Sequence, residues 1–439
     1  MIYMQTITNI KTIRSNIKHL PETVKYLMVS TFIFVLWRWL GSDIFLSIYI
    51  EQIIDKIWIV GVLGAILAAT KLLLSIPIGY LNDKTNPKYI LIIAKLMYII
   101  CGLCYFAAGI LESPELLIIG IVLNGLASPI LFTTTMSIVR EETDNTQATQ
   151  AFGLFQTATQ WSYFVWAIII SFFVDSIPLY YVFLAIVVFS FISMLRTTTI
   201  PIQEERGLWK TIDAYIFHQN VYKKVRQDLK EYNITLYLTL FLQFLYGIVD
   251  YLWFLFIPLL ALSNDLTLWQ IALIFAIMRI PHLLSVYFAG TLDKYNQFIV
   301  VCTTYITIGL FLWWLAYTKA FVGILALSLC ISACLAVLRP ILLWFIGRLV
   351  ENRHKAEITW VQETVTRTGE IVGSIWFALI AQYSTIQRWF FIVWVLLILI
   401  AIGTLLQQHL FILPTRNIGT SIRHTAVNIF TTLKEYTRR

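Results

Sequence analysis

The chain has 439 residues, of which 59% are hydrophobic and only 13% are charged, and its mean hydropathy is +0.77. Because a soluble domain carries about 25% charged residues, this composition excludes an ordinary water-soluble protein. The formal net charge of +8 is assigned to loops on one side of a membrane and does not indicate nucleic-acid binding. We therefore expect an all-α membrane protein, since a helix satisfies its own backbone hydrogen bonds in lipid.

Residues 1–25 scatter four basic side chains among apolar ones. They lack the compact apolar core and the small-residue cleavage site of a signal peptide, so we expect a cytoplasmic segment. Apolar runs of about 20 residues, the length that spans a bilayer, follow along the chain. They predict twelve transmembrane helices at 26–50, 57–80, 89–110, 116–139, 150–174, 178–195, 233–261, 267–290, 297–317, 320–346, 358–381 and 389–413.

These runs predict two pseudo-symmetric bundles of six helices, at 26–195 and at 233–413. Between them, 196–232 keeps apolar and basic residues at helical spacing, which predicts a cytoplasmic linker with an amphipathic helix on the inner membrane surface. Residues 414–439 form a basic cytoplasmic tail.

Matching residues recur at a nearly constant offset, which indicates that one bundle is a duplicate of the other. The offsets are 207, 208 and 211 residues for the pairs Asp43 and Asp250, Lys71 and Arg279, and Pro129 and Pro340. Both prolines begin the same tripeptide, Pro-Ile-Leu.

The basic residues predict the orientation of the chain. Of the 32 Lys and Arg residues, 23 fall in the N-terminal segment, the even-numbered connections and the C-terminal tail. The odd-numbered connections hold only Lys56, Lys319 and Arg388. Because cytoplasmic loops are enriched in Lys and Arg, both termini are expected in the cytoplasm of a multi-pass protein of the cytoplasmic membrane.

A polar turn at 79–88 separates the second and third runs, and 289–294 forms a looser echo of it in the second half. Gly, Asn and Pro make turns in any membrane protein, so the first copy alone would also suit an ordinary loop. At this turn the chain resembles the major facilitator superfamily of secondary transporters, whose pattern is G-x-L-x-D-[RK]-x-G-[RK]-[RK]. The matching residues are Gly79, Leu81, Asp83, Lys84 and Lys88.

The resemblance in layout covers nearly the whole chain, and it implies two bundles that rock about a midplane site. It also implies that Asp83 closes the inner face by accepting hydrogen bonds at the start of a neighbouring helix. Asn86 stands where the family has glycine and tolerates a left-handed backbone better than most residues. Pro87 replaces a usual arginine, which puts one inner-gate salt bridge in doubt.

Ten charged residues fall inside the predicted spans, where each costs at least ~2.5–3.5 kcal/mol. Lys95 lies close enough to Lys88 to reach back to the inner surface, so we set it aside. The solute and proton pathway is predicted to use Arg38, Asp43, Lys71, Asp250, Arg279, Arg367 and Glu370. The inner gate is predicted to use Gly79, Asp83, Lys84, Lys88, Asp293, Arg339 and Glu363.

The eleventh span has the densest group of polar residues. Glu363, Arg367, Glu370 and Ser374 follow helical spacing, which places them within about 60° on one face. Two carboxylates beside one Arg suit a proton-coupled carrier, which needs an acid that holds a proton in one state and releases it in another. We choose Glu370 as that acid and Asp250 second. The alternative is an ion network that only closes the inner gate, or salt bridges that only fix packing.

The five cysteines lie inside apolar runs, so Cys101 and Cys104 are interpreted as core residues rather than as a redox or metal motif. We find no nucleotide-binding glycine motif and no nucleophile constellation, and we expect neither a cofactor nor an enzyme. The fifth run also lacks the glycine- and proline-rich signature of drug/proton antiporters.

We therefore expect a secondary active transporter of a small organic solute, coupled to protons and working by alternating access. Six basic against four acidic residues inside the spans favour an anionic or zwitterionic solute. A multidrug exporter of the same superfamily, or a non-transporting receptor on this scaffold, is the alternative. The expected partners are the solute, protons and membrane lipid, with no nucleic acid, and the protein is expected to be a monomer.

Overall fold

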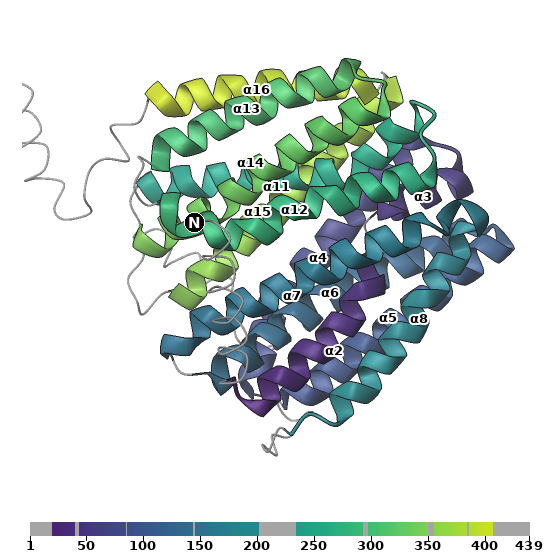
Figure 1. Cartoon of the computed structure of the whole chain (residues 1–439), viewed down its shortest axis with the longest axis vertical. Helices are drawn as coiled ribbons and strands as arrows, with labels where there is room; N and C mark the ends of the chain where they lie inside the picture. The colour runs from purple at the N-terminus through teal and green to yellow at the C-terminus, as the bar shows by residue number, and fades with distance from the viewer. Residues whose placement is uncertain are drawn as a thin grey trace, which may run out of the picture.

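The computed structural model describes residues 20–39, 44–84, 86–143, 145–201, 234–292, 297–349, 355–383 and 386–406. In the N-terminal half these residues form the helices α2 (Glu22–Trp39), α3 (Leu46–Ile54), α4 (Ile57–Lys84), α5 (Pro87–Leu111), α6 (Pro114–Glu142), α7 (Asn145–Ser171) and α8 (Leu179–Thr198), with a short 3-10 helix η2 (Val174–Ser176). Apart from α3, which lies beside α11 at the right of the view, these α-helices make up the lower part of the molecule in Figure 1.

The C-terminal half, the upper part of Figure 1, contains α11 (Ile234–Leu262), α12 (Leu268–Leu292), α13 (Gln297–Tyr317), α14 (Phe321–Leu349), α15 (Lys355–Tyr383) and α16 (Ile386–Leu406). No strand forms among the described residues. Each predicted span coincides with one helix, except that the first is divided between α2 and α3. Seven of the helices are long and apolar enough to cross a membrane by length and composition. The all-α fold class is confirmed.

The polar segment 79–88 is more helical than the sequence predicts. α4 continues through Gly79 and Asp83, so only Thr85 and Asn86 connect it to α5. Asn86 has φ −68° and ψ 113°, and its side chain accepts a hydrogen bond from the amide of Lys88 at 3.0 Å. The residue before a proline is held extended, which suits an N-cap. Asn86 is therefore the N-cap of α5, and its backbone is extended rather than left-handed.

The helices of the two halves repeat in the same order and with the same neighbours. The helices α12 to α16 begin 207 to 211 residues after α4 to α8 respectively. In the first half α5 packs on α6 and α8, and α4 packs on α6. In the second half α13 packs on α14 and α16, and α12 packs on α14. The same helix arrangement is thus built twice, as the sequence offsets predict.

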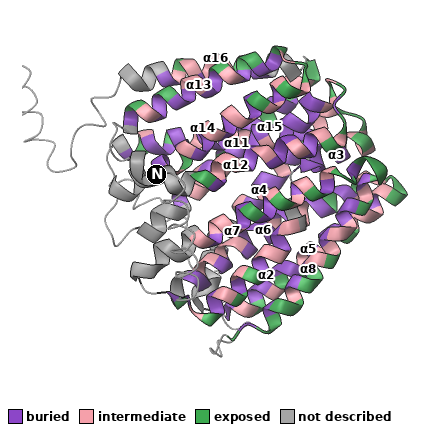
Figure 2. Cartoon of the chain, viewed as in Figure 1, coloured by how far each residue is buried: buried purple, intermediate pink, exposed green. Residues whose placement is uncertain are grey.

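The two halves meet mainly along three pairs of α-helices, with a smaller contact between η2 and α12. α4 packs on α15, α7 packs on α12, and α3 packs on α11. The first two pairs are equivalent under the repeat, since α12 is the counterpart of α4 and α15 that of α7. Of the helices at this boundary, α11 is mostly buried, whereas α4, α7 and α15 alternate between buried and more exposed residues (Figure 2).

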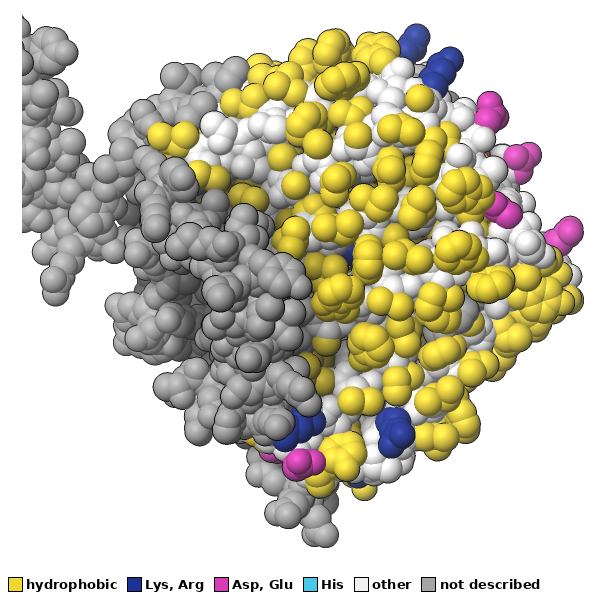
Figure 3. Space-filling view, viewed as in Figure 1, with side chains coloured by type: hydrophobic (Ala, Val, Ile, Leu, Met, Phe, Trp, Pro, Cys, Tyr) yellow, Lys and Arg dark blue, Asp and Glu magenta, His cyan; other side chains and the backbone are white. Residues whose placement is uncertain are grey.

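The outer face of the bundle suits a lipid environment. Hydrophobic side chains cover most of the described surface in Figure 3, and the acidic and basic side chains gather near its margins. Large exposed hydrophobic residues such as Leu111, Phe172, Trp314 and Val322 would be costly in water but are stable against acyl chains. The chain is therefore a multi-pass membrane protein.

Candidate functional site

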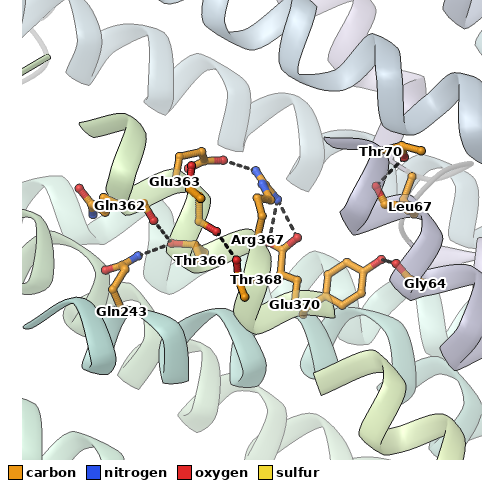
Figure 4. Close-up of polar contacts among 12 residues, drawn as sticks. Gly64, Leu67, Thr70, Gln243, Gln362, Glu363, Thr366, Arg367, Thr368 and Glu370 are labelled. Atoms are coloured by element: carbon orange, nitrogen blue, oxygen red, sulfur yellow. Dashed lines mark hydrogen bonds and ion pairs between the residues drawn. The ribbon is translucent and has the colours of Figure 1, made fainter. Parts of the chain in front are cut away.

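An ion group on α15 forms the centre of the site. The Arg367 guanidinium donates from Nη1 to both oxygens of Glu370, at 2.7 and 2.9 Å, and from Nη2 to Oε1 of Glu363. Figure 4 shows the three side chains on one side of the helix, with Arg367 between the two carboxylates. The predicted common face of these residues is therefore observed, because spacings of three and four residues bring side chains together on a helix.

The three side chains differ in exposure. The Glu370 side chain is 5% exposed, that of Arg367 is 25% exposed, and that of Glu363 is 46% exposed. Glu370 thus holds Arg367 from the protein interior, whereas Glu363 contacts it from the accessible side. A bidentate carboxylate pair is geometrically specific, so Glu370 positions the guanidinium.

α15 is held tightly against α11 by small residues and one polar contact. The Gln243 side-chain amide donates to the Thr366 hydroxyl at 2.8 Å, and that hydroxyl donates to the carbonyl of Gln362. A Cβ added at Gly247 or Gly369 would collide with the backbone of the opposite helix. Close approach of this kind lets α11 and α15 act as one unit beneath the ion group.

Further charged groups from the C-terminal half surround the ion group. Asp250 of α11 interacts electrostatically with Arg339 of α14, with Arg279 of α12 and with both Glu370 and Arg367. Arg339 also interacts with Glu363, and both residues are accessible, since Arg339 is exposed and the Glu363 side chain is about half exposed. Water therefore reaches this side of the cluster.

The N-terminal half contributes Lys71 of α4. Lys71 is 8% exposed, its Nζ lies 5.8 Å from the ring centroid of Tyr251, and it interacts electrostatically with Glu363 across the boundary between the halves. The Tyr251 hydroxyl donates to the carbonyl of Gly64 at 2.8 Å, again from α11 to α4. Lys71 and Tyr251 thus tie the cluster to the opposite half.

A second contact between the halves surrounds Arg279. Its guanidinium lies 4.7 Å from the ring centroid of Phe254 and 5.1 Å from that of Tyr163, and its Nη1 is 3.5 Å from the side-chain oxygen of Gln160. Gln160 and Tyr163 belong to α7, whereas Phe254 belongs to α11. Arginine stacks readily on aromatic faces, so this site binds the two halves through one cation.

The halves also touch at the end of the molecule that carries α3. The backbone amide of Trp269, at the start of α12, donates to Asp175 of η2 at 3.3 Å. A Cβ at Gly61 of α4 would collide with the backbone of Ser374 and Ala378 in α15. The two halves are therefore in contact at this end, which the charge distribution predicts to lie outside the cell.

One lysine, Lys95, lies elsewhere than the sequence predicts. Lys95 does not reach the surface: it is 1% exposed and donates to Ser30 at 2.7 Å, to the carbonyl of Ser193 at 3.2 Å and to the Thr197 hydroxyl. Three neutral oxygens around it remove the need for a water contact. Lys88, predicted at the inner gate, donates to the carbonyl of Ile200 at 3.1 Å within its own half.

Several predicted residues lie outside the described part of the chain. Asp43 and Asp293 are outside it, as are the linker 202–233 and the C-terminal tail. The backbones of Arg38, Gly79, Asp83 and Lys84 belong to α2 and α4, but their side chains are outside the description. The structure brings together Lys71, Asp250, Arg279, Arg339, Glu363, Arg367 and Glu370.

Sequence reasoning missed the uncharged partners of this cluster. Gln160, Tyr163, Tyr251 and Phe254 hold or flank its cations, yet apolar spans contain many such residues. Gln160 and Gln243 could have been singled out from the sequence, since a side-chain amide inside a membrane span needs a hydrogen-bond partner. Among the described residues, no three His, Cys, Asp or Glu side chains gather closely enough to hold a metal ion.

Comparison with known proteins agrees with this architecture. The family model described as Major Facilitator Superfamily matches residues 27–374. No curated protein sequence matches the chain. The crystal structure of the nucleoside transporter NupG superimposes with a TM-score of 0.69 at 14% identity, over 90% of this chain and 100% of that one. The human organic anion transporter MFSD10 (TETRAN) does so with a TM-score of 0.62 at 11% identity, over 88% of this chain and 100% of that one.

At such identities the two structures show the fold alone. The family model, however, covers most of the sequence, including the segment 79–88 on which the resemblance was drawn. That resemblance is confirmed. The chain belongs to the Major Facilitator Superfamily.

Proposed function

We propose that the protein is a secondary active transporter, and not an enzyme, that moves a small organic solute across the cell membrane by alternating access. It is coupled to protons, and both of its termini lie in the cytoplasm. The observation that carries the proposal is the ion group Glu363–Arg367–Glu370 at the boundary between the halves, where α15 packs on α4. Charges at membrane depth are costly and mark transport pathways and proton relays.

The arrangement provides what alternating access needs. Rocking of one half against the other breaks and remakes contacts at their boundary, and here those contacts include Lys71 with Tyr251 and Arg279 with Tyr163. The ion group therefore changes its surroundings whenever the halves move. Glu370, enclosed and bound by one arginine, is the group whose protonation would release Arg367.

By their names, one of the two structural neighbours is a nucleoside transporter and the other is an organic anion transporter. A neutral nucleoside would leave the one surplus positive charge of the cluster uncompensated, whereas an organic anion would balance it. The described cluster holds the cations Lys71, Arg279, Arg339 and Arg367 against the carboxylates Asp250, Glu363 and Glu370. We therefore favour an organic anion as the solute.

The test replaces Glu370 by Gln, which keeps the shape of the side chain but cannot ionise. Proteoliposomes with the wild-type protein should accumulate one compound from a set of nucleosides and organic anions when a pH gradient is imposed. Glu370→Gln should abolish that accumulation but retain exchange of solute across the membrane. Glu142→Gln, which changes an exposed acid at the end of α6, is the control and should behave as wild type. If Glu370→Gln still accumulates the solute, Glu370 is not the proton-carrying carboxylate and Asp250 becomes the candidate.

A further inference from the structure

We propose that the Glu363 carboxylate occupies the place of the solute's own anionic group, in an anion site formed by Arg367, Arg339 and Lys71. The inference rests on the proposed transport function and names the part of the site that recognises the solute. A carboxylate or a phosphate would displace Glu363 and bind the same cations.

The first observation is the number of cations that share one acid. Glu363 interacts electrostatically with Arg367 on its own helix, with Arg339 on α14 and with Lys71 on α4. Three helices from both halves thus direct positive charge at a single carboxylate. Arginine is the side chain best suited to hold carboxylate or phosphate oxygens, because its planar guanidinium donates in pairs.

The second observation is that Arg367 binds Glu370 and Glu363 unequally. Glu370 receives two hydrogen bonds from Arg367 and is almost fully enclosed, whereas Glu363 receives one and its side chain is 46% exposed. An exposed ion pair with one hydrogen bond contributes little stability, so it exchanges readily with another anion. Glu363 is therefore the displaceable partner, and its carboxylate can turn into water as the solute enters.

The third observation is the balance of charge around the site. Asp250 and Tyr246 face it from α11, Arg279 and His282 belong to α12, and Arg339 to α14. With His282 neutral, the site as a whole has four cations, counting Lys71, and three carboxylates, so it carries one surplus positive charge. A bound anion removes that surplus, so the site remains balanced when both Glu363 and a solute are present.

The site also joins the halves. Lys71 comes from α4, while the two arginines come from the C-terminal half. An anion held by all three would pull α4 towards α14 and α15. Binding of the solute is thus coupled to the position of the halves, since a ligand shifts an equilibrium towards the state that it contacts best.

The experiment removes the internal competitor. The full-length chain is purified in a non-ionic detergent, and thermal shifts are titrated with benzoate, succinate and phenyl phosphate, each beside its neutral counterpart benzamide, succinamide or phenol. Glu363→Gln should bind at least one anion about tenfold more tightly than wild type, the factor that about 1.4 kcal/mol of competition supplies. The neutral compounds should show no such gain, and Arg339→Gln added to this variant should reverse it.

Glu142→Gln is the matched control for loss of one negative charge and should bind as wild type does. Glu363→Asp has a side chain one methylene shorter, and its anion affinity should lie between those of wild type and Glu363→Gln. It replaces Glu363→Gln in the experiment if Glu363→Gln does not fold. Three results would each overturn the anion site. The first is equal affinity of wild type and Glu363→Gln for every anion, and the second is no anion binding by either variant at position 363. The third is a gain in affinity for the neutral compounds equal to that for the anions. Gradient-driven uptake of a neutral solute by the wild type would then still support the proposed function.

Discussion

Gly369 allows α15 to approach the backbone of α11 more closely than a larger residue would. A Cβ at this position would meet the carbonyl of Phe244 far inside van der Waals contact, and backbone atoms cannot move aside as a flexible side chain can. Gly369→Ala should therefore destabilise the protein by about 1–3 kcal/mol, the usual cost of overpacking. The measurement is the thermal unfolding midpoint in detergent.

Gly309 provides the matched control for this change. A Cβ there would lie 3.3 Å from a side-chain carbon of Trp394, which can shift by a few tenths of an ångström. Gly309→Ala should leave the midpoint almost unchanged. Equal midpoints for both variants would show that α11 and α15 are less tightly packed than described.

At the scale of the helix, the bond from Tyr251 to Gly64 joins α11 to the first part of α4, at the end of the molecule that we expect to lie outside the cell and call the outer end. Tyr251→Phe keeps the ring beside Lys71 but removes this bond. One hydrogen bond contributes a net free energy of about 0.5–1.5 kcal/mol. The ratio of molecules with the outer end closed to molecules with it open should therefore fall about two- to tenfold. Spin labels on cysteines placed at the exposed residues Gln52 and Lys319 should report longer distances between the halves.

Tyr305 makes the same kind of bond without crossing between the halves. Its hydroxyl donates to the carbonyl of Leu242 at 2.7 Å, and both residues belong to the C-terminal half. Tyr305→Phe should lower stability by a similar amount and leave the distance distribution as it is in wild type. A shift of equal size in both variants would mean that the bond to Gly64 does not hold the outer end closed.

At the scale of the whole molecule, we predict the orientation of the chain from the charge of its connections. Gln52 lies at the exposed end of α3, next to a connection with a single lysine, whereas the basic linker contains Gln227. In a cysteine-free background, Gln52→Cys should react with an impermeant maleimide added to intact cells. Gln227→Cys should react only after the membrane is opened. Reaction of Gln227→Cys in intact cells would reverse the orientation.

The sequence by itself determined the membrane class, the repeated helix order and the face of α15 that carries Glu363, Arg367 and Glu370. The first and last follow from properties that act locally, namely apolar length and the periodicity of a helix, and the repeat follows from comparing the two halves of the sequence. The same local rules missed the extension of α4 through Asp83, because a single glycine does not end a helix and only Pro87 does.

Tertiary structure alone decided which side chains meet. Lys95 finds Ser30, Ser193 and Thr197 on two other helices, and nothing near it in the sequence reveals that its amine is enclosed. Likewise, Tyr251 reaches Gly64 across 187 positions of the chain. The sequence assigns Glu370 to the pathway and Glu363 to the gate, but only the structure shows how far each side chain is exposed. Partners and water access depend on how helices pack, and packing sums contributions from residues that lie far apart in the chain.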